Sequence, residues 1–226
     1  PYSFQDMTII SEMLWSPTFL EWSSKFLLRS PTLTKLSLNF DYDDRLWVPH
    51  VQGQEPRAWL ANLQEIVLPA LNSFTCWSQI ELGSKPIQLI YQAIAHFVSR
   101  HPTIETLVIQ RCHIPDTGYS DFVRVHGPLL PRLRHLQAHP ALVRWILQEK
   151  KRVFDTLEDI NLDITGHAGP LDVYDLLNQC LLMLLHHGLN RPGVQLRFTF
   201  PDINHACRWF QYHIDAAGPR VQPLSE

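Results

Sequence analysis

Ile104-Glu105-Thr106-Leu107-Val108-Ile109-Gln110-Arg111-Cys112-His113-Ile114 is the stretch of this chain that decides the fold. Its apolar residues follow the spacing L-x-x-L-x-L-x-x-N/C-x-L, in which a short strand directs apolar side chains to one side. The spacing recurs at Leu33-Leu36-Leu38, Leu71-Phe74-Cys76, Leu133-Leu136-Ala138 and Leu157-Ile160-Leu162, and Val194–Phe200 alternates with a period of two. The second apolar positions, 36, 74, 107, 136, 160 and 196, are 24 to 38 residues apart, which leaves room for a helix after each strand.

The segments between these strands carry apolar residues at helical spacing, and proline stands at or near several of their starts, where it favours the first turn. Helices are predicted for Ser16–Arg29, around Pro56–Asn62, and from Ser84, Pro140, Pro170 (ending near Gly188) and Pro201. The helix from Pro170 is expected to turn Leu171, Tyr174, Leu177, Leu181, Leu184 and Leu185 inward. Three tryptophans, Trp22, Trp145 and Trp209, lie in such apolar stripes and are expected in the core.

Regular alternation of strand and helix predicts an α/β fold built like a leucine-rich-repeat solenoid. Because one unit cannot bury its own apolar side, neighbouring units are expected to stack with parallel strands on the concave face and helices on the convex face. No Ser/Gly-rich linker divides the chain, so we expect one irregular repeat domain over residues 1–216 and a C-terminal tail at 217–226.

Composition narrows the function classes. The 226 residues include 19 Lys+Arg and 22 Asp+Glu, for a net charge of −3, so no excess of positive charge predicts binding to nucleic acid or to an anionic membrane. The longest apolar run, Cys180–Leu185, is far shorter than a membrane span. The four cysteines form no CxxC pair and are interpreted as buried thiols of a reducing compartment, either cytoplasmic or nuclear.

Three short motifs resemble the repeats of fungal F-box/leucine-rich-repeat proteins. They are Leu68-Pro69-Ala70-Leu71-Asn72-Ser73-Phe74, His101-Pro102-Thr103-Ile104-Glu105-Thr106-Leu107 and Leu130-Pro131-Arg132-Leu133-Arg134-His135-Leu136. The resemblance covers roughly residues 30–200 and implies that the repeats capture a protein for ubiquitylation. In that family an F-box docks on the adaptor of a cullin–RING ligase. Residues 1–30 contain no L-P-x-E-I-type opening, so an adaptor is an expected partner only if an F-box lies upstream.

The residues that alternate with the apolar positions should form the surface that binds a protein partner. They are mostly short and polar: Lys35, Ser37, Asn39, Thr75, Trp77, Gln110, His135, Gln137, Asp159, Asn161, Asp163 and Arg197. The acidic pair Asp159 and Asp163, beside Asn161 and His135, suggests a basic partner segment.

The sequence predicts no catalytic residues, no metal ligands and no cofactor. His135 and His139 have the i, i+4 spacing of a helical zinc pair, but they fall on a predicted strand, where they would lie about 13 Å apart. No glycine-rich phosphate loop is present. Two alternatives to a non-enzymatic binding protein remain open: a small-molecule or carbohydrate binder with a pocket near Trp77, and a hydrolase whose loops bring together His113, Asp116 and His126.

Overall fold

The structure is a computed structural model that describes residues 4–10, 17–39, 63, 65–77, 84–110, 130–147, 154–164, 170–189 and 191–200. Its strands are β1 (Asp6–Ile9), β2 (Lys35–Asn39), β3 (Ser73–Trp77), β4 (Thr106–Gln110), β5 (His135–Ala138), β6 (Asp159–Asp163) and β7 (Gln195–Thr199). The helices of these described segments are α2 (Pro17–Leu28), α4 (Ser84–Ser99), α6 (Pro140–Leu147) and α7 (Pro170–His186).

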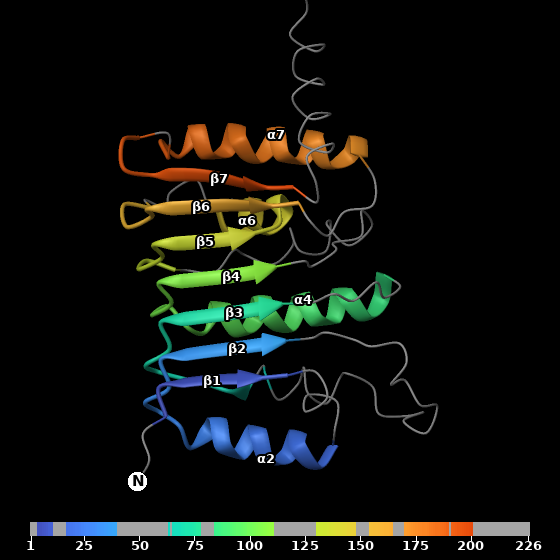
Figure 1. The fold of residues 1–226 in the computed structure, drawn as a ribbon, viewed down its shortest axis with the longest axis vertical. Coiled ribbons are helices and arrows are strands. Elements are labelled where there is room, and N and C mark those ends of the chain that lie inside the picture. The colour runs from blue at the N-terminus through green and yellow to red at the C-terminus, as the bar shows by residue number, and fades with distance from the viewer. Residues whose placement is uncertain are drawn as a thin grey trace, which may run out of the picture.

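The seven strands form one sheet in which they hydrogen-bond in chain order, β1 to β7, and every pair is parallel. Figure 1 shows the seven arrows stacked and pointing the same way. The predicted α/β class and the six predicted strands are therefore confirmed.

The first strand, β1, is an addition to the prediction. Its sequence, Asp6-Met7-Thr8-Ile9, has only two apolar residues and lacks the full repeat spacing. Pairing with β2 orders it, since the Gln5 carbonyl accepts hydrogen bonds from the backbone N–H groups of Thr34 and Lys35, both at 2.9 Å. A strand at the edge of a sheet can thus form from a weak local pattern when its neighbour supplies the hydrogen bonds.

The repeat positions of successive units stand in register across the sheet. One column runs through Met7, Leu36, Phe74, Leu107, Leu136, Ile160 and Leu196. From Leu36 to Ile160 these side chains are at most 1% exposed, whereas Leu196 on the last strand is 42% exposed. The column is therefore a continuous buried seam that opens at β7.

A similar turn precedes each strand from β2 to β7. The turns span Ser30–Leu33, Leu68–Leu71, His101–Ile104, Leu130–Leu133, Phe154–Leu157 and Arg191–Val194, each closed by a backbone hydrogen bond of 3.1–3.3 Å. Proline occupies the second position in all but the fifth, where Asp155 stands. Because proline fixes φ at the value this position requires, the turn is pre-set and starts each strand at the same point of its unit.

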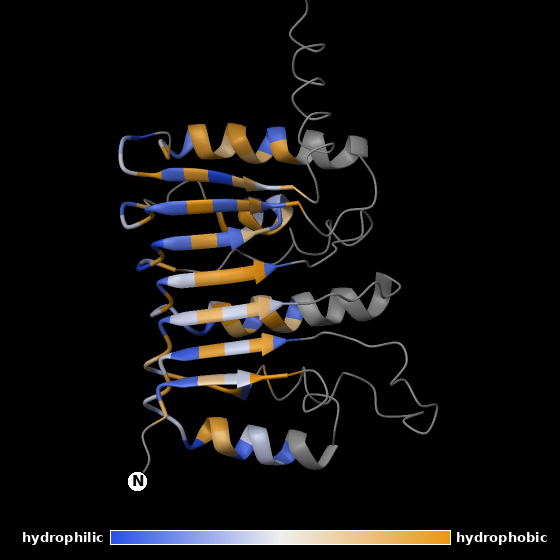
Figure 2. Ribbon diagram, viewed as in Figure 1, coloured by the Kyte–Doolittle hydropathy of each residue, from blue (hydrophilic) through white to orange (hydrophobic). Residues whose placement is uncertain are grey.

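The apolar side of the sheet faces the helices. Figure 1 shows α4 and α6 behind the strands, and the Phe74 ring of β3 lies 4.9 Å, centroid to centroid, from the Phe97 ring of α4. Both rings are fully buried. Figure 2 shows β4, which carries Leu107 and Ile109, as a predominantly hydrophobic strand near the middle of the sheet. The core therefore lies between the sheet and these helices.

The helix predictions hold for α2, α4, α6 and α7, and Gly188 follows α7 with φ of 67°, as expected of a helix stop. Trp145 is buried as predicted. Two orientation predictions are wrong: Trp22 is 52% exposed and Leu185 is 53% exposed. Figure 1 places α2 and α7 beside the first and last strands, where fewer neighbouring units are available to cover a helix.

Several predictions fall outside the described residues. They concern the helices around Pro56–Asn62 and from Pro201, Trp209, and the tail at 217–226. The single domain over residues 1–216 stays a prediction. Among the helices that the structure describes, none is long and apolar enough to cross a membrane.

Candidate binding face

The strand alternation brings all twelve predicted partner-binding residues to one side of the sheet. Each occupies the first, third or fifth position of its strand, alternating with apolar residues. Since Phe74 points toward α4, the residues that alternate with it point away from that helix. We call this side of the sheet, formed by the first, third and fifth positions of the strands, the polar face.

The register arranges the polar face in rows across the strands. At the carboxyl ends of β2, β3 and β4, Asn39 pairs with Trp77, and Trp77 pairs with Gln110. A middle row runs through Thr8, Ser37, Thr75, Val108, Gln137, Asn161 and Arg197, and a row at the amino ends runs through Asp6, Lys35, Ser73, Thr106, His135, Asp159 and Gln195. The predicted residues thus lie beside one another and not scattered over the fold.

Two residues of this face, Asp6 and Thr8, were not predicted from the sequence because β1 itself was not predicted. They stand opposite Lys35 and Ser37. The alternation of polar and apolar residues in Asp6-Met7-Thr8-Ile9 is the signal that could have found them, although four residues are a short pattern.

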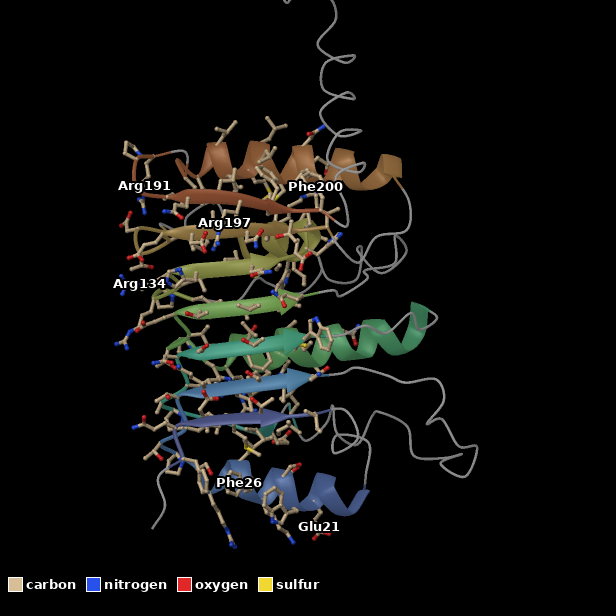
Figure 3. The ribbon with its side chains drawn as sticks, viewed as in Figure 1. Glu21, Phe26, Arg134, Arg191, Arg197 and Phe200 are labelled. Atoms are coloured by element: carbon tan, nitrogen blue, oxygen red, sulfur yellow. The ribbon has the colours of Figure 1, made fainter. Side chains whose placement is uncertain are left out.

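An ion pair joins the last two strands on the polar face. The Arg197 Nε donates to Asp159 Oδ1 at 2.9 Å, and its Nη2 donates to Asp159 Oδ2. These hydrogen bonds raise the pKa of the Arg197 guanidinium. The His135 Nδ1 lies 4.0 Å from the same carboxylate. Figure 3 shows Arg197 over β6 and β7, whereas Arg134 and Arg191 lie near the amino ends of the strands. The Asp159 carboxylate is therefore engaged within the chain.

Asn161 and Asp163, the other polar-face residues of β6, are more buried than a binding surface requires. Asn161 is 9% exposed and accepts a hydrogen bond of 3.0 Å from the Thr199 hydroxyl. Asp163 is 5% exposed. With Asp159 held by Arg197 and Asp163 covered, this region does not present an open acidic patch, so the structure does not favour the predicted basic partner segment.

Charge distinguishes two parts of the polar face among strands β2 to β7. On β2, β3 and β4 its nine positions are Lys35, Ser37, Asn39, Ser73, Thr75, Trp77, Thr106, Val108 and Gln110, of which Lys35 alone is charged. Strands β5 to β7 carry the ionic cluster of His135, Asp159 and Arg197. The polar face thus has a strip on β2 to β4 with Lys35 as its one charged residue, beside a part on β5 to β7 whose charges are largely paired.

The histidine pair that spacing raised as a zinc candidate has separate structural positions. His135 is in β5, whereas His139 is buried and its Nδ1 accepts a hydrogen bond of 3.3 Å from the Ala141 backbone N–H at the start of α6. His139 therefore caps this helix. Within the described ranges, no three His, Cys, Asp or Glu side chains are grouped as a metal site.

The cysteines within the described residues, Cys76 and Cys180, are buried and form no disulfide, as the sequence predicted. Burial raises the pKa of the Cys180 thiol to about 12, so this thiol is unreactive at neutral pH. Cys112, Cys207 and the residues of the hydrolase alternative, His113, Asp116 and His126, lie outside the described residues.

Comparison with known proteins adds no identification: neither a scan against protein-family models nor a search of the curated proteins returns a match for this chain. The polar face and the repeat geometry are therefore the basis for assigning a function.

Proposed function

We propose that this chain is a leucine-rich-repeat-like solenoid that binds a protein partner on its polar face and catalyses no reaction. It resembles the substrate-recognition part of an F-box ubiquitin-ligase subunit. One observation carries the proposal: seven parallel strands follow chain order in a common register, with apolar side chains toward the helices and polar ones away from them.

Curvature follows from the dimensions of the two layers. Neighbouring strands are about 4.8 Å apart, whereas a helix with its side chains is about 10 Å wide. Helices on one side of a stack of strands therefore spread that side more than the other. The polar face then becomes the concave side, where a partner meets residues from several strands at once.

The polar face suits binding because its side chains are already held in place. Most are short and project from hydrogen-bonded strands, so a partner orders few flexible groups on docking. The Arg197–Asp159 pair fixes one of its long side chains before any partner arrives. Such a preformed surface favours selective binding without a large entropic penalty.

The ligase role rests on the repeat motifs. The Leu-Pro and His-Pro motifs that resemble the fungal family form the turns at Leu68–Leu71, His101–Ile104 and Leu130–Leu133. The residues that carry the resemblance therefore also have a common structural role here. Under this proposal the protein works in the cytoplasm or nucleus, and an F-box joined to it would recruit the ligase adaptor.

The test compares charge additions on and off the polar face of the tagged full-length protein. Thr75→Arg with Gln137→Arg places two cations on the polar face, and Glu21→Arg places one on the exposed side of α2, where Glu21 bonds only Lys25 among the described residues. Proteins that co-purify with the wild type should be lost with the first variant and kept with the second.

Two further readouts judge the proposal. Recovery of a cullin and its adaptor, together with a longer lifetime of the co-purified partner when the gene is deleted, supports the ligase role. Identical sets of partners with both variants would show that the polar face is not the binding surface.

A further inference from the structure

Three residues at the carboxyl ends of neighbouring strands form a distinct group on the polar face. Asn39, Trp77 and Gln110 stand in register on β2, β3 and β4, so the indole lies between two carboxamides. We call these three residues the Trp77 row. It lies in the strip on β2 to β4, at the opposite end of the strands from Lys35, which is the one charged residue of that strip.

The spacing of the Trp77 row matches an extended polypeptide that crosses the strands. Asn39 and Gln110 are two strand spacings apart, or about 9.6 Å. Three residues of an extended chain cover about 10 Å. A carboxamide offers both an acceptor and two N–H donors, so it can bond a backbone N–H and a backbone C=O together. The two amides can therefore hold a short peptide stretch while the side chain between them contacts the indole.

Electrostatics select against charge in the bound stretch. The one charged side chain of the strip, Lys35, is four residues from Asn39 along β2, or about 13 Å. The nearest ionic cluster, on β5 to β7, is already paired internally. A partner charge buried on the Trp77 row would lose its hydration without gaining a counter-charge.

The size of the face suits an extended segment. Seven strands at about 4.8 Å and up to five residues at about 3.3 Å give a flat outline of roughly 29 by 16 Å. An extended chain of about nine residues is about 30 Å long, so one such segment can cross all the strands.

We propose that the partner docks through an extended segment without charged residues. This inference rests on the protein-binding function proposed above. One apolar side chain of that segment contacts Trp77, and its backbone hydrogen-bonds with Asn39 and Gln110.

The test selects random displayed dodecapeptides on the immobilised chain and measures the affinity of synthetic copies by fluorescence anisotropy. Trp77→Ala removes the aromatic contact, and Gln110→Glu keeps the side-chain size but adds a charge. Gln137→Ala, on β5 of the same face, tests the polar face outside the row, and Glu21→Ala, on the exposed side of α2, is the control. Circular dichroism confirms that each variant is folded. If Trp77→Ala does not fold, Gln110→Glu tests the row by itself.

We expect selected peptides to share an apolar residue with no charged residue within two positions of it. Trp77→Ala and Gln110→Glu should each raise Kd at least tenfold, and by more than Gln137→Ala does, whereas Glu21→Ala should leave Kd within about twofold. Two results would refute binding at the Trp77 row but leave protein binding by the polar face intact. One is that the selected peptides are rich in charged residues. The other is that peptide binding is lost with Gln137→Ala but kept with Trp77→Ala and Gln110→Glu. Neutral oligosaccharides that bind in a Trp77-dependent way would overturn the peptide assignment.

If no selected peptide responds to any substitution on the polar face, both this inference and the proposed function fail.

Discussion

His101 offers the sharpest test of how neighbouring units are joined. Its ring is 1% exposed and links two units: Nε2 accepts from the Leu68 N–H at 2.9 Å, and Nδ1 lies 2.6 Å from the Phe97 carbonyl. Because a backbone N–H can only donate, Nε2 must be unprotonated and Nδ1 must carry the proton. The ring is therefore neutral, and burial, the main cause, lowers its pKa below the ordinary value of 6.5.

The perturbation is His101→Phe, which keeps a ring beside Phe97 but removes both hydrogen bonds. The Phe97 carbonyl keeps the Arg100 N–H as a donor, whereas the Leu68 N–H loses the acceptor it has in the native chain. A buried N–H without an acceptor costs about 1–3 kcal/mol. We therefore expect the free energy of unfolding, from urea titration at pH 7.5, to fall by about that amount.

The pH dependence has a definite sign. A histidine whose pKa is lowered in the folded state binds more protons when unfolded, so its stabilising effect is complete above pH 6.5 and is lost as the pH falls toward the folded pKa. The loss can reach about 1.4 kcal/mol per pH unit. The advantage of the wild type over His101→Phe should therefore shrink between pH 7.5 and pH 5.5. A difference that stays constant or grows over this range would refute a neutral, accepting His101.

Three further outcomes follow from the core, a turn and a thiol. Phe74→Ala should lower the free energy of unfolding by about 3–5 kcal/mol in urea titration, because the fully buried ring packs on Phe97; a loss below about 1 kcal/mol would contradict that packing. Gly193→Ala should lower the free energy of unfolding by about 1 kcal/mol, because alanine is strained at a φ of 97° even though no atom lies within 4 Å of the added Cβ. An unchanged melting temperature would contradict this turn conformation. Cys180 should resist iodoacetamide at pH 8 in the native protein and react in urea, as followed by peptide mass spectrometry; rapid native labelling would disprove its burial.

The sequence predicts the structure correctly where the structure depends on short-range spacing. Apolar residues at alternate positions, as in Leu36 and Leu38, identify both the strand and the side that is buried. The same alternation identified Ser37 and its equivalents as residues of the polar face. Prolines before the strands, such as Pro69, mark turns because they restrict φ locally. These features need only neighbouring residues, so they can be read before the fold is known.

The errors occur where a residue's surroundings come from distant parts of the chain. The apolar stripe of α2 shows that Trp22 shares a helix face with other apolar residues, but not that a further layer covers that face. Likewise, no local pattern shows that Arg197 pairs with Asp159 from 38 residues away. This ion pair and the burial of Asp163 are the reasons that the two aspartates do not form an open acidic patch. Burial and pairing depend on which strands become neighbours.

The sequence by itself determined the order of the repeat strands, the direction of their side chains and the composition of the polar face, because alternation along a strand is local geometry. The tertiary structure decided the pairing that orders β1, the exposure of the end helices, and the ion pairing of the polar face on β5 to β7. Those properties arise from contacts between units, and spacing within a unit carries no information about what lies beside it.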